Sequence, residues 1–141
     1  MMEFNVTATW KNEQGSTAKC KQASLVLDTA SKSRNDAFNP AELLLAALSA
    51  CIIKGIERVA PMIDFSFHHL EVHVHGVRQD VPPKMESIYY EVRLGTDETD
   101  QRLELLHENI RKYGTVYNTI ISGTDLSGAV VRIPIKHEGG K

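Results

Sequence analysis

Cysteine is scarce in this sequence, since only Cys20 and Cys51 occur among its 141 residues. Two cysteines do not make the disulfide framework that stabilises many small secreted domains. Each is therefore interpreted first as a small buried apolar residue, and further evidence is needed to give either one a chemical role.

The sequence also lacks a charge excess and a long apolar run. Its formal net charge is −2, which gives no electrostatic reason to expect nucleic acid or an anionic membrane as a partner. The longest apolar run covers residues 43–53, interrupted only by Ser49, whereas a membrane-spanning helix needs roughly 20 residues. Because the N-terminus has no basic stretch followed by an apolar one, we expect no secretory leader and a cytoplasmic location.

The residues that are present indicate one domain, 1–141, with an α+β fold. Strands are predicted at residues 3–10, 17–21, 24–27, 65–77, 87–94 and 128–135, from apolar and polar alternation and from the turn residues between them. Helices are predicted at residues 96–112 and 115–121, besides a longer one before residue 60. This order is typical of helices packed on antiparallel sheet.

The longer helix carries the strongest local signals in the chain. Asn39 is a favourable N-cap, Pro40 suits the first helical position, and Glu42 is placed to complete a capping box. The helix is predicted to run to about residue 59, because Pro61 prevents its continuation. Its first three turns are apolar nearly all round, so we expect the central helix of the domain, buried on most sides.

Two segments together resemble a known family. Residues 39–51, NPAELLLAALSAC, resemble the helix that leads to the reactive cysteine in osmotically inducible protein C (OsmC) and the organic hydroperoxide resistance proteins. Residues 112–120, KYGTVYNTI, resemble that family's second hallmark, a Cys-Pro-Val-x-Asn-Thr-type sequence that opens a short helix. The element order fits over nearly the whole chain. The resemblance implies the OsmC-like fold, with antiparallel sheets around a long buried central helix, assembled as an intertwined homodimer.

The resemblance also implies a chemistry and a site. Cys51 stands at the position of the reactive thiol, which a hydroperoxide oxidises to a sulfenic acid in the peroxidase members. A second cysteine then condenses with the sulfenic acid, and an external dithiol reduces the disulfide. The partners implied are therefore a second copy of the chain, a small hydroperoxide and an external thiol reductant, with no cofactor and no metal.

The sequence departs from the family pattern at three places. The second hallmark cysteine falls on Gly114, an acidic residue of the hydroperoxidase members falls on Ala41, and no arginine precedes Arg34. Cys20 lies in a predicted N-terminal strand with no geometric reason to meet Cys51. With Cys51 at the reactive position but no resolving cysteine, the expected activity is that of a single-cysteine hydroperoxide reductase that uses an outside thiol. The three departures motivate the alternative, a non-catalytic dimer that binds a small apolar ligand or senses redox state through Cys51.

A reactive Cys51 requires positive charge nearby, because a cysteine reacts as its thiolate. Lys54 follows three residues later on the same helix face, and Arg34 lies in the loop before the helix. These two residues complete the predicted catalytic set. The alternative interpretation is that Lys54 reaches solvent and that Arg34 is an exposed loop charge.

Two further groups of side chains have alternative interpretations. His69, His73 and His75 share one face of a predicted strand with Glu71, and such a face could hold zinc or copper, or could simply be the exposed side of that strand. The four tyrosines at positions 89, 90, 113 and 117 could line a pocket. For Tyr113 and Tyr117, which flank the second hallmark at helical spacing, packing is the favoured interpretation.

Overall fold

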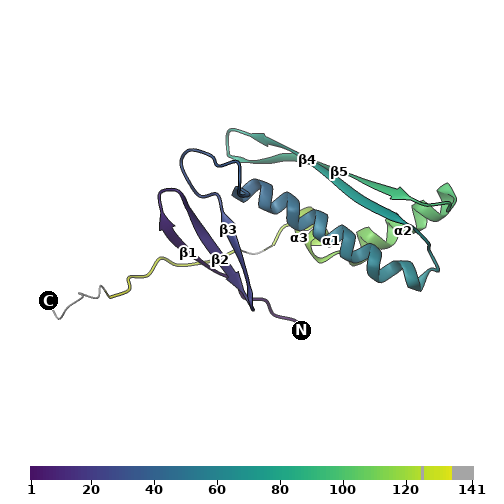
Figure 1. Ribbon diagram of the computed structural model, residues 1–141, viewed down its shortest axis with the longest axis horizontal. Coiled ribbons are helices and arrows are strands. Elements are labelled where there is room, and N and C mark those ends of the chain that lie inside the picture. The colour runs from purple at the N-terminus through teal and green to yellow at the C-terminus, as the bar shows by residue number, and fades with distance from the viewer. Residues whose placement is uncertain (125, 135–141) are drawn as a thin grey trace.

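The computed structural model describes residues 1–124 and 126–134, which form two distinct parts (Figure 1). The elements in chain order are β1 (Thr7–Asn12), β2 (Gly15–Cys20), β3 (Ala23–Leu27), α1 (Pro40–Met62), β4 (His69–Gln79), β5 (Lys84–Gly95), α2 (Asp100–Tyr113) and α3 (Thr115–Ser122). The first three strands make one antiparallel sheet, here called the N-terminal sheet, and β4 pairs with β5 in a second. The elements from α1 to α3 make up the body. The predicted α+β fold is confirmed.

The start of α1 follows the local signals of the sequence. Asn39 Oδ1 accepts a hydrogen bond from the Glu42 backbone at 2.8 Å, and Glu42 Oε1 accepts one from the Asn39 backbone at 2.9 Å. The predicted capping box is therefore confirmed. The predicted end was too early, since α1 includes Pro61 in its last turn and finishes at Met62. A proline there removes one helical hydrogen bond, and the helix ends at the next residue.

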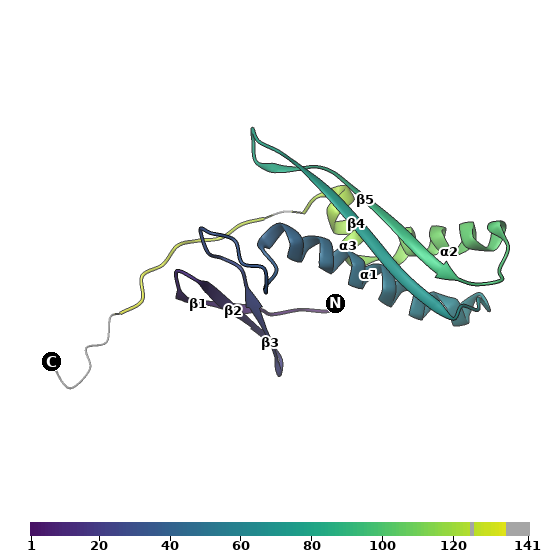
Figure 2. The same cartoon turned by 45° about the horizontal axis from the view of Figure 1, so that its top comes forward.

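The core of the body forms on one face of α1. The buried apolar residues among those described are Leu48, Ile52, Ile56, Val59, Ala60, Phe65, Leu106 and Ile110, so α1 supplies five of the eight. The β4–β5 hairpin lies over α1 and α2 (Figure 2), and its inward residues are partly buried against this core. α1 is thus the central helix of the body, although the single chain covers only one face and leaves Leu44 and Ile53 exposed.

Residues 63–68 form the connection that turns the chain from α1 into β4, where the sequence predicted that the strand had already begun at residue 65. The Phe65 backbone donates to Ala60 O at 2.8 Å, so the chain wraps around the end of the helix. Arg102 of α2 fixes this connection. Its Nη2 donates to Ile63 O at 2.6 Å and to Asp64 O at 2.9 Å, while its Nε donates to Glu98 at 2.9 Å.

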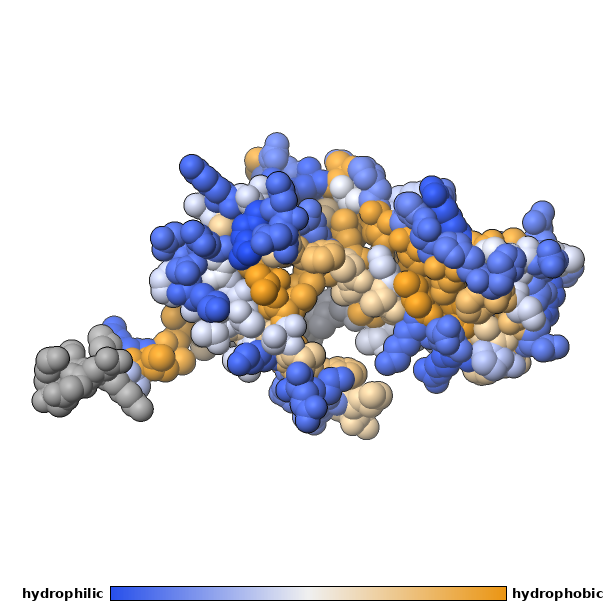
Figure 3. Space-filling model, in the orientation of Figure 1, coloured by the Kyte–Doolittle hydropathy of each residue, from blue (hydrophilic) through white to orange (hydrophobic). Residues whose placement is uncertain are grey.

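The N-terminal sheet buries little apolar surface in a single chain. Every residue of β1 is exposed, including Trp10 at 70 % of its surface, and Phe4 and Val6 just before the strand are exposed as well. Its contacts with the body are sparse. Apolar residues also gather on the surface over the middle of the molecule, along α1 (Figure 3). The chain therefore leaves apolar surface open on both of its parts.

The last strand predicted from the sequence is not formed in the single chain. Residues 128–134 have no assigned secondary structure, and Val130, Val131 and Ile133 are exposed. Residue 135 lies outside the described residues. A strand needs a neighbouring strand to satisfy its backbone hydrogen bonds, and this segment extends past the end of the body without one (Figure 1). Among the described helices, none combines the length and apolar composition that crossing a membrane requires.

Candidate active site around Cys51

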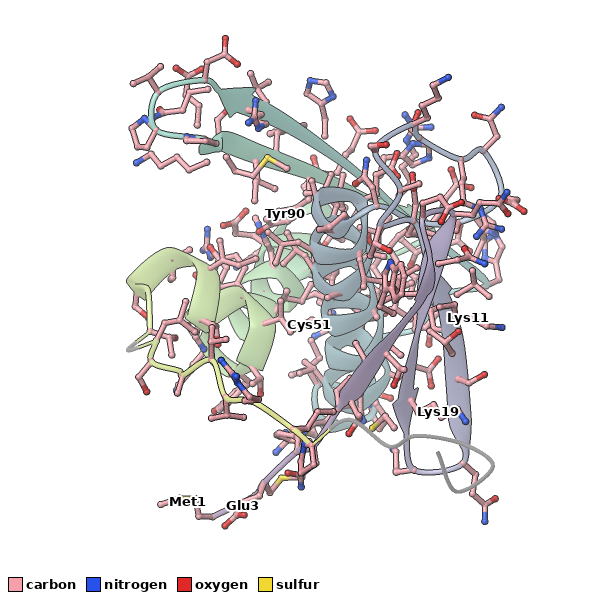
Figure 4. The ribbon with its side chains drawn as sticks, turned by 90° about the vertical axis from the view of Figure 1, so that its left-hand side faces the viewer. Met1, Glu3, Lys11, Lys19, Cys51 and Tyr90 are labelled. Atoms are coloured by element: carbon pink, nitrogen blue, oxygen red, sulfur yellow. The ribbon has the colours of Figure 1, made fainter. Side chains whose placement is uncertain are left out.

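Cys51 lies in the fourth turn of α1, on the side that faces α2 and α3 and away from the N-terminal sheet (Figure 4). It is a free thiol and is half-buried. The residue opposite its sulfur is Gly114, where α2 ends and α3 begins. A Cβ atom built on Gly114 would lie 3.2 Å from Cys51 Sγ. The two segments that carry the sequence resemblance therefore meet at this thiol.

The close approach of Gly114 explains why no side chain stands there. Its φ of −75° and ψ of 117° are ordinary for any residue, so backbone conformation does not require a glycine. A Cβ would instead meet Ile110 O at 3.1 Å, Tyr117 Cβ at 3.1 Å and Cys51 Sγ at 3.2 Å. Ordinary carbon contacts are about 3.5–4.0 Å. Glycine thus allows the backbone of the α2–α3 junction to pack directly against the sulfur.

This junction places the start of α3 beside the thiol. Gly114 is the N-cap of α3, and no side chain among the described residues caps this helix end. The first N–H groups of a helix have no partner within the helix, and they carry a partial positive charge that favours a nearby anion. The junction therefore places a helix N-terminus next to Cys51, which is a common neighbour of reactive cysteines.

The two predicted activating residues are not joined to Cys51 by any interaction within the part of the chain that the structure describes. Lys54 is exposed. Arg34 pairs with both oxygens of Asp36, at 2.8 and 2.9 Å, and its Nη1 donates to Gln14 O at 3.3 Å in the turn between β1 and β2. This ion pair lowers the pKa of Asp36. The catalytic roles of Lys54 and Arg34 stay predictions.

Cys20 occupies the end of β2, where it pairs with Ala23 of β3. It is also a free thiol. Cys20 belongs to the N-terminal sheet, whereas Cys51 faces the opposite side of α1 (Figure 4). Within one chain, the two cysteines therefore do not form the pair that would close a disulfide.

A polar contact that the sequence did not indicate lies close to this site. The Tyr90 hydroxyl and His107 Nε2 are 2.5 Å apart, and the Tyr90 ring packs edge-on against Tyr117 with 6.2 Å between centroids. Burial raises the pKa of Tyr90, and it also lowers that of His107, which Arg111 lowers further. Both shifts favour the neutral forms of the two rings, and the direction of the Tyr90–His107 hydrogen bond depends on the His107 tautomer. A signal in the sequence that could have indicated this contact is helical spacing, which puts His107 on the same face of its helix as Leu103 and Ile110.

The other tyrosines differ in their environments. Tyr117 packs against the core, as predicted for it. Tyr113 is about half-exposed, and the ammonium of Lys112 lies 5.3 Å from the centre of its ring. Packing of the pair is thus confirmed for Tyr117 alone.

The histidine face of β4 forms as the alternation predicted, with His69, Glu71, His73 and His75 all exposed. Glu71 accepts hydrogen bonds from His73 and from His69, the latter at 3.4 Å, and these bonds lower the pKa of Glu71. Over residues 1–124 and 126–134, however, no group of three or more histidine, cysteine, aspartate or glutamate side chains is arranged to hold a metal ion. The face is the solvated side of the hairpin.

Comparison with known proteins gives a consistent result. The family model described as OsmC-like protein matches residues 33–127, which include Cys51 and Gly114. No curated protein matches the chain. Among solved structures, an OsmC-like protein from Mycoplasma pneumoniae is 21% identical, with a TM-score of 0.80, covering 86% of this chain and 89% of its own.

Two other similar structures are hydroperoxide resistance proteins by name. One from Legionella pneumophila is 16% identical, with a TM-score of 0.64, covering 89% of this chain and 93% of its own. The organic hydroperoxide resistance protein OhrB of Bacillus subtilis is also 16% identical, with a TM-score of 0.57 and coverages of 88% and 94%. At these identities the likeness shows the fold.

Proposed function

Because the chain belongs to the OsmC-like protein family, we propose that it is a stress-response reductase of organic hydroperoxides. Cys51 is the reactive thiol, and an external thiol completes the cycle in the cytoplasm. The observation that carries the proposal is the contact between Cys51 and Gly114, which brings the two hallmark segments together at one sulfur. Two of the similar folds are named as hydroperoxide resistance proteins.

The reaction balances with thiols alone. The Cys51 thiolate attacks the terminal oxygen of the hydroperoxide, an S–O bond forms as the O–O bond breaks, and the alkoxide leaves and takes a proton as the alcohol. One external thiolate then attacks the sulfenic sulfur, forming a mixed disulfide as hydroxide leaves and is protonated to water. A second external thiolate releases Cys51 and leaves as a disulfide. Two electrons pass from two thiols to one peroxide.

The start of α3 supports the first step of this scheme. A thiolate at a helix N-terminus is stabilised by the partial positive charge there, and the effect is typically about 0.3–1 kcal/mol. In this chain Gly114 brings that helix end against the sulfur without an intervening side chain. We therefore propose that this helix end takes part in activating Cys51, beside the predicted Lys54 and Arg34.

We also propose that two copies of the chain assemble as the intertwined homodimer that the resemblance implies. The support is the apolar surface that a single chain leaves open. Trp10 and the residues around it on β1, Leu44 and Ile53 on α1, and Val130 to Ile133 beyond α3 are all exposed. Exposed apolar patches of this extent mark interaction sites. A second copy offers the same surfaces and the missing neighbour for the C-terminal segment.

One observation favours the second candidate, a non-catalytic dimer that binds a small apolar ligand or senses redox state through Cys51. Arg34 is held by Asp36 and by the β1–β2 turn, and Lys54 is exposed. Among the described residues of one chain, therefore, neither of these cationic side chains contacts the Cys51 sulfur. The two candidates differ in whether Cys51 turns over, so kinetics separates them.

The test is turnover of cumene hydroperoxide with dithiothreitol or cysteine as the reductant. Cys51→Ser is expected to abolish turnover, because no other group forms the sulfenic acid. Cys20→Ser is the matched control and is expected to retain it, since Cys20 lies in the N-terminal sheet. Wild-type protein that turns over none of several hydroperoxides with either thiol would rule out the reductase and favour the second candidate.

A second variant examines how the sulfenic acid is resolved. In a disulfide, the Cβ of one cysteine lies roughly 3 Å from the other sulfur, and a Cβ on Gly114 would lie 3.2 Å from Cys51 Sγ. Gly114→Cys is therefore expected to give an intramolecular disulfide with Cys51 after one equivalent of peroxide. Gly114→Ser is the control and offers no sulfur. If Gly114→Cys keeps both thiols free after oxidation, position 114 does not face the sulfur in solution.

A further inference from the structure

A cleft between β5 and α2 lies apart from the Cys51 site. It has a volume of about 310 Å³, at the lower end of the range for small-molecule sites. Eleven residues line it, and Cys51 and Gly114 are not among them. In Figure 2, α2 lies at the end of the body away from the N-terminal sheet, while β5 runs along the body. None of the exposed apolar residues that support the proposed homodimer lines the cleft.

The floor of the cleft is apolar. It is formed by Val92 and Leu94 of β5 and by Leu103, Leu106 and Ile110 of α2, and the last two are core residues. Tyr89 and Tyr90 supply aromatic walls, and the Tyr89 side chain is 66 % exposed. An aliphatic or aromatic group of a ligand would find ordinary hydrophobic contacts on this floor.

The rim of the cleft is acidic. Glu91, Asp100 and Glu104 line it, and none of its eleven lining residues is a lysine or an arginine. Glu91 is paired with Arg93 at 2.6 Å, and Glu104 lies 3.9 Å from Arg111. Asp100 takes part in none of the ion pairs between described residues. One carboxylate of the rim is thus left without a cationic partner.

The other polar groups of the cleft supply no cation that would pair with Asp100. His107 lines it beside Tyr90, and burial together with Arg111 lowers the pKa of His107, so the imidazole is neutral near pH 7. Its Nε2 is already bonded to the Tyr90 hydroxyl at 2.5 Å.

From this arrangement we infer that the β5–α2 cleft binds a small organic monocation with an apolar body, such as an arylalkylamine. The ammonium group pairs with Asp100, at the end of the cleft where α2 begins, and the apolar body lies on the leucine and valine floor. This binding is independent of the chemistry of Cys51. Because the carboxylate is exposed, the affinity decreases as ionic strength rises.

Titration of the full-length protein with phenethylamine, followed by NMR, tests this binding. Saturable shifts are expected for the His107 ring and for β5 and α2 backbone amides, with phenylacetate, the anion with the same ring, giving none. Asp100→Asn is expected to weaken phenethylamine binding about tenfold, as for a charged hydrogen bond, whereas Asp100→Glu retains it. Glu108→Gln, an exposed carboxylate of the same helix outside the cleft, is the matched control and leaves the affinity unchanged.

Three outcomes overturn the inference. One is the absence of saturable shifts with phenethylamine, and another is equal binding of phenylacetate. The third is an Asp100→Asn variant that is folded, by its circular dichroism and amide spectrum, and binds phenethylamine as the wild type does. Each outcome leaves the hydroperoxide reductase proposal untouched, since Cys51 takes no part in the experiment.

Discussion

The N-terminal sheet and the body use similar apolar residues, yet only the body buries them within one chain. Ile52 and Ile56 of α1 have no exposed surface, whereas Trp10 and Val6 at the N-terminal sheet are largely exposed. The body stacks a hairpin on helices, so each apolar face meets another. The N-terminal sheet is a single layer of three strands with few contacts elsewhere.

This difference shows which part of the chain can pack its apolar residues without a partner. A fold element is stable when its apolar face is packed against a second layer. The body has such layers, and it also holds Cys51 and Gly114. The N-terminal sheet has its second layer only if another surface covers it, which is the physical basis of the proposed homodimer. The site and the assembly therefore depend on different parts of the chain.

The largest effect is expected from a cavity in the body. Ile56→Ala removes a side chain with no exposed surface and is expected to lower the free energy of unfolding by about 2–5 kcal/mol. Ile121→Ala, on exposed α3 surface, is the control and is expected to cost at most about 0.5 kcal/mol. Denaturant unfolding at one fixed protein concentration measures both. An equal loss of unfolding free energy in the two variants would mean that the core of the body around Ile56 is not tightly packed.

A smaller effect, confined to assembly, is expected from the N-terminal sheet. Trp10→Ser is expected to weaken self-association by about 2 kcal/mol or more, roughly 30-fold in Kd, because exposed tryptophans that become buried are frequent binding hot spots. Tyr89→Ser, an exposed aromatic of the body, serves as the comparison and leaves association unchanged. Sedimentation velocity over a range of concentrations provides the measurement. A wild type that stays monomeric would contradict the proposed dimer.

The smallest expected effect is a pH dependence of stability that arises from His107 in the body. Because burial lowers the pKa of His107, the unfolded chain binds more protons than the folded one as the pH falls through about 6.5. Stability therefore decreases on acidification from pH 7, until the lowered folded-state pKa is passed. His107→Gln is expected to flatten this dependence between pH 7 and 5. Urea midpoints at several pH values measure it, and parallel curves for both proteins would contradict the account.

Local signals predicted the helices well and the strands less well. The capping box at Asn39 and Glu42 and the short helix after Gly114 were confirmed, because their hydrogen bonds lie within a few residues. Residues 65–68 continue the strand pattern but wrap the end of α1, just after Ile63 and Asp64, whose carbonyl groups accept hydrogen bonds from Arg102, 39 and 38 residues away. The strand predicted at 128–135 requires a pairing partner, and residues 128–134 find none among the described residues of one chain.

The site was predicted in part for a similar reason. Cys51 and Gly114 were singled out through the family resemblance, and their contact joins residues far apart in the sequence. Charge alone could not place Arg34 and Lys54, because the structure gives Arg34 a nearer partner in Asp36. The Tyr90–His107 contact has no local signature, since it depends on how α2 packs beside β5.

The central claim is that Cys51 is a reactive thiol toward hydroperoxides. Mass spectrometry of the wild-type protein after one equivalent of cumene hydroperoxide, with a sulfenic-acid trap present, tests it most directly. The account predicts trapped sulfenic acid on Cys51, with Cys20 left as the free thiol. An unmodified Cys51, with the peroxide still intact in solution, would contradict the claim.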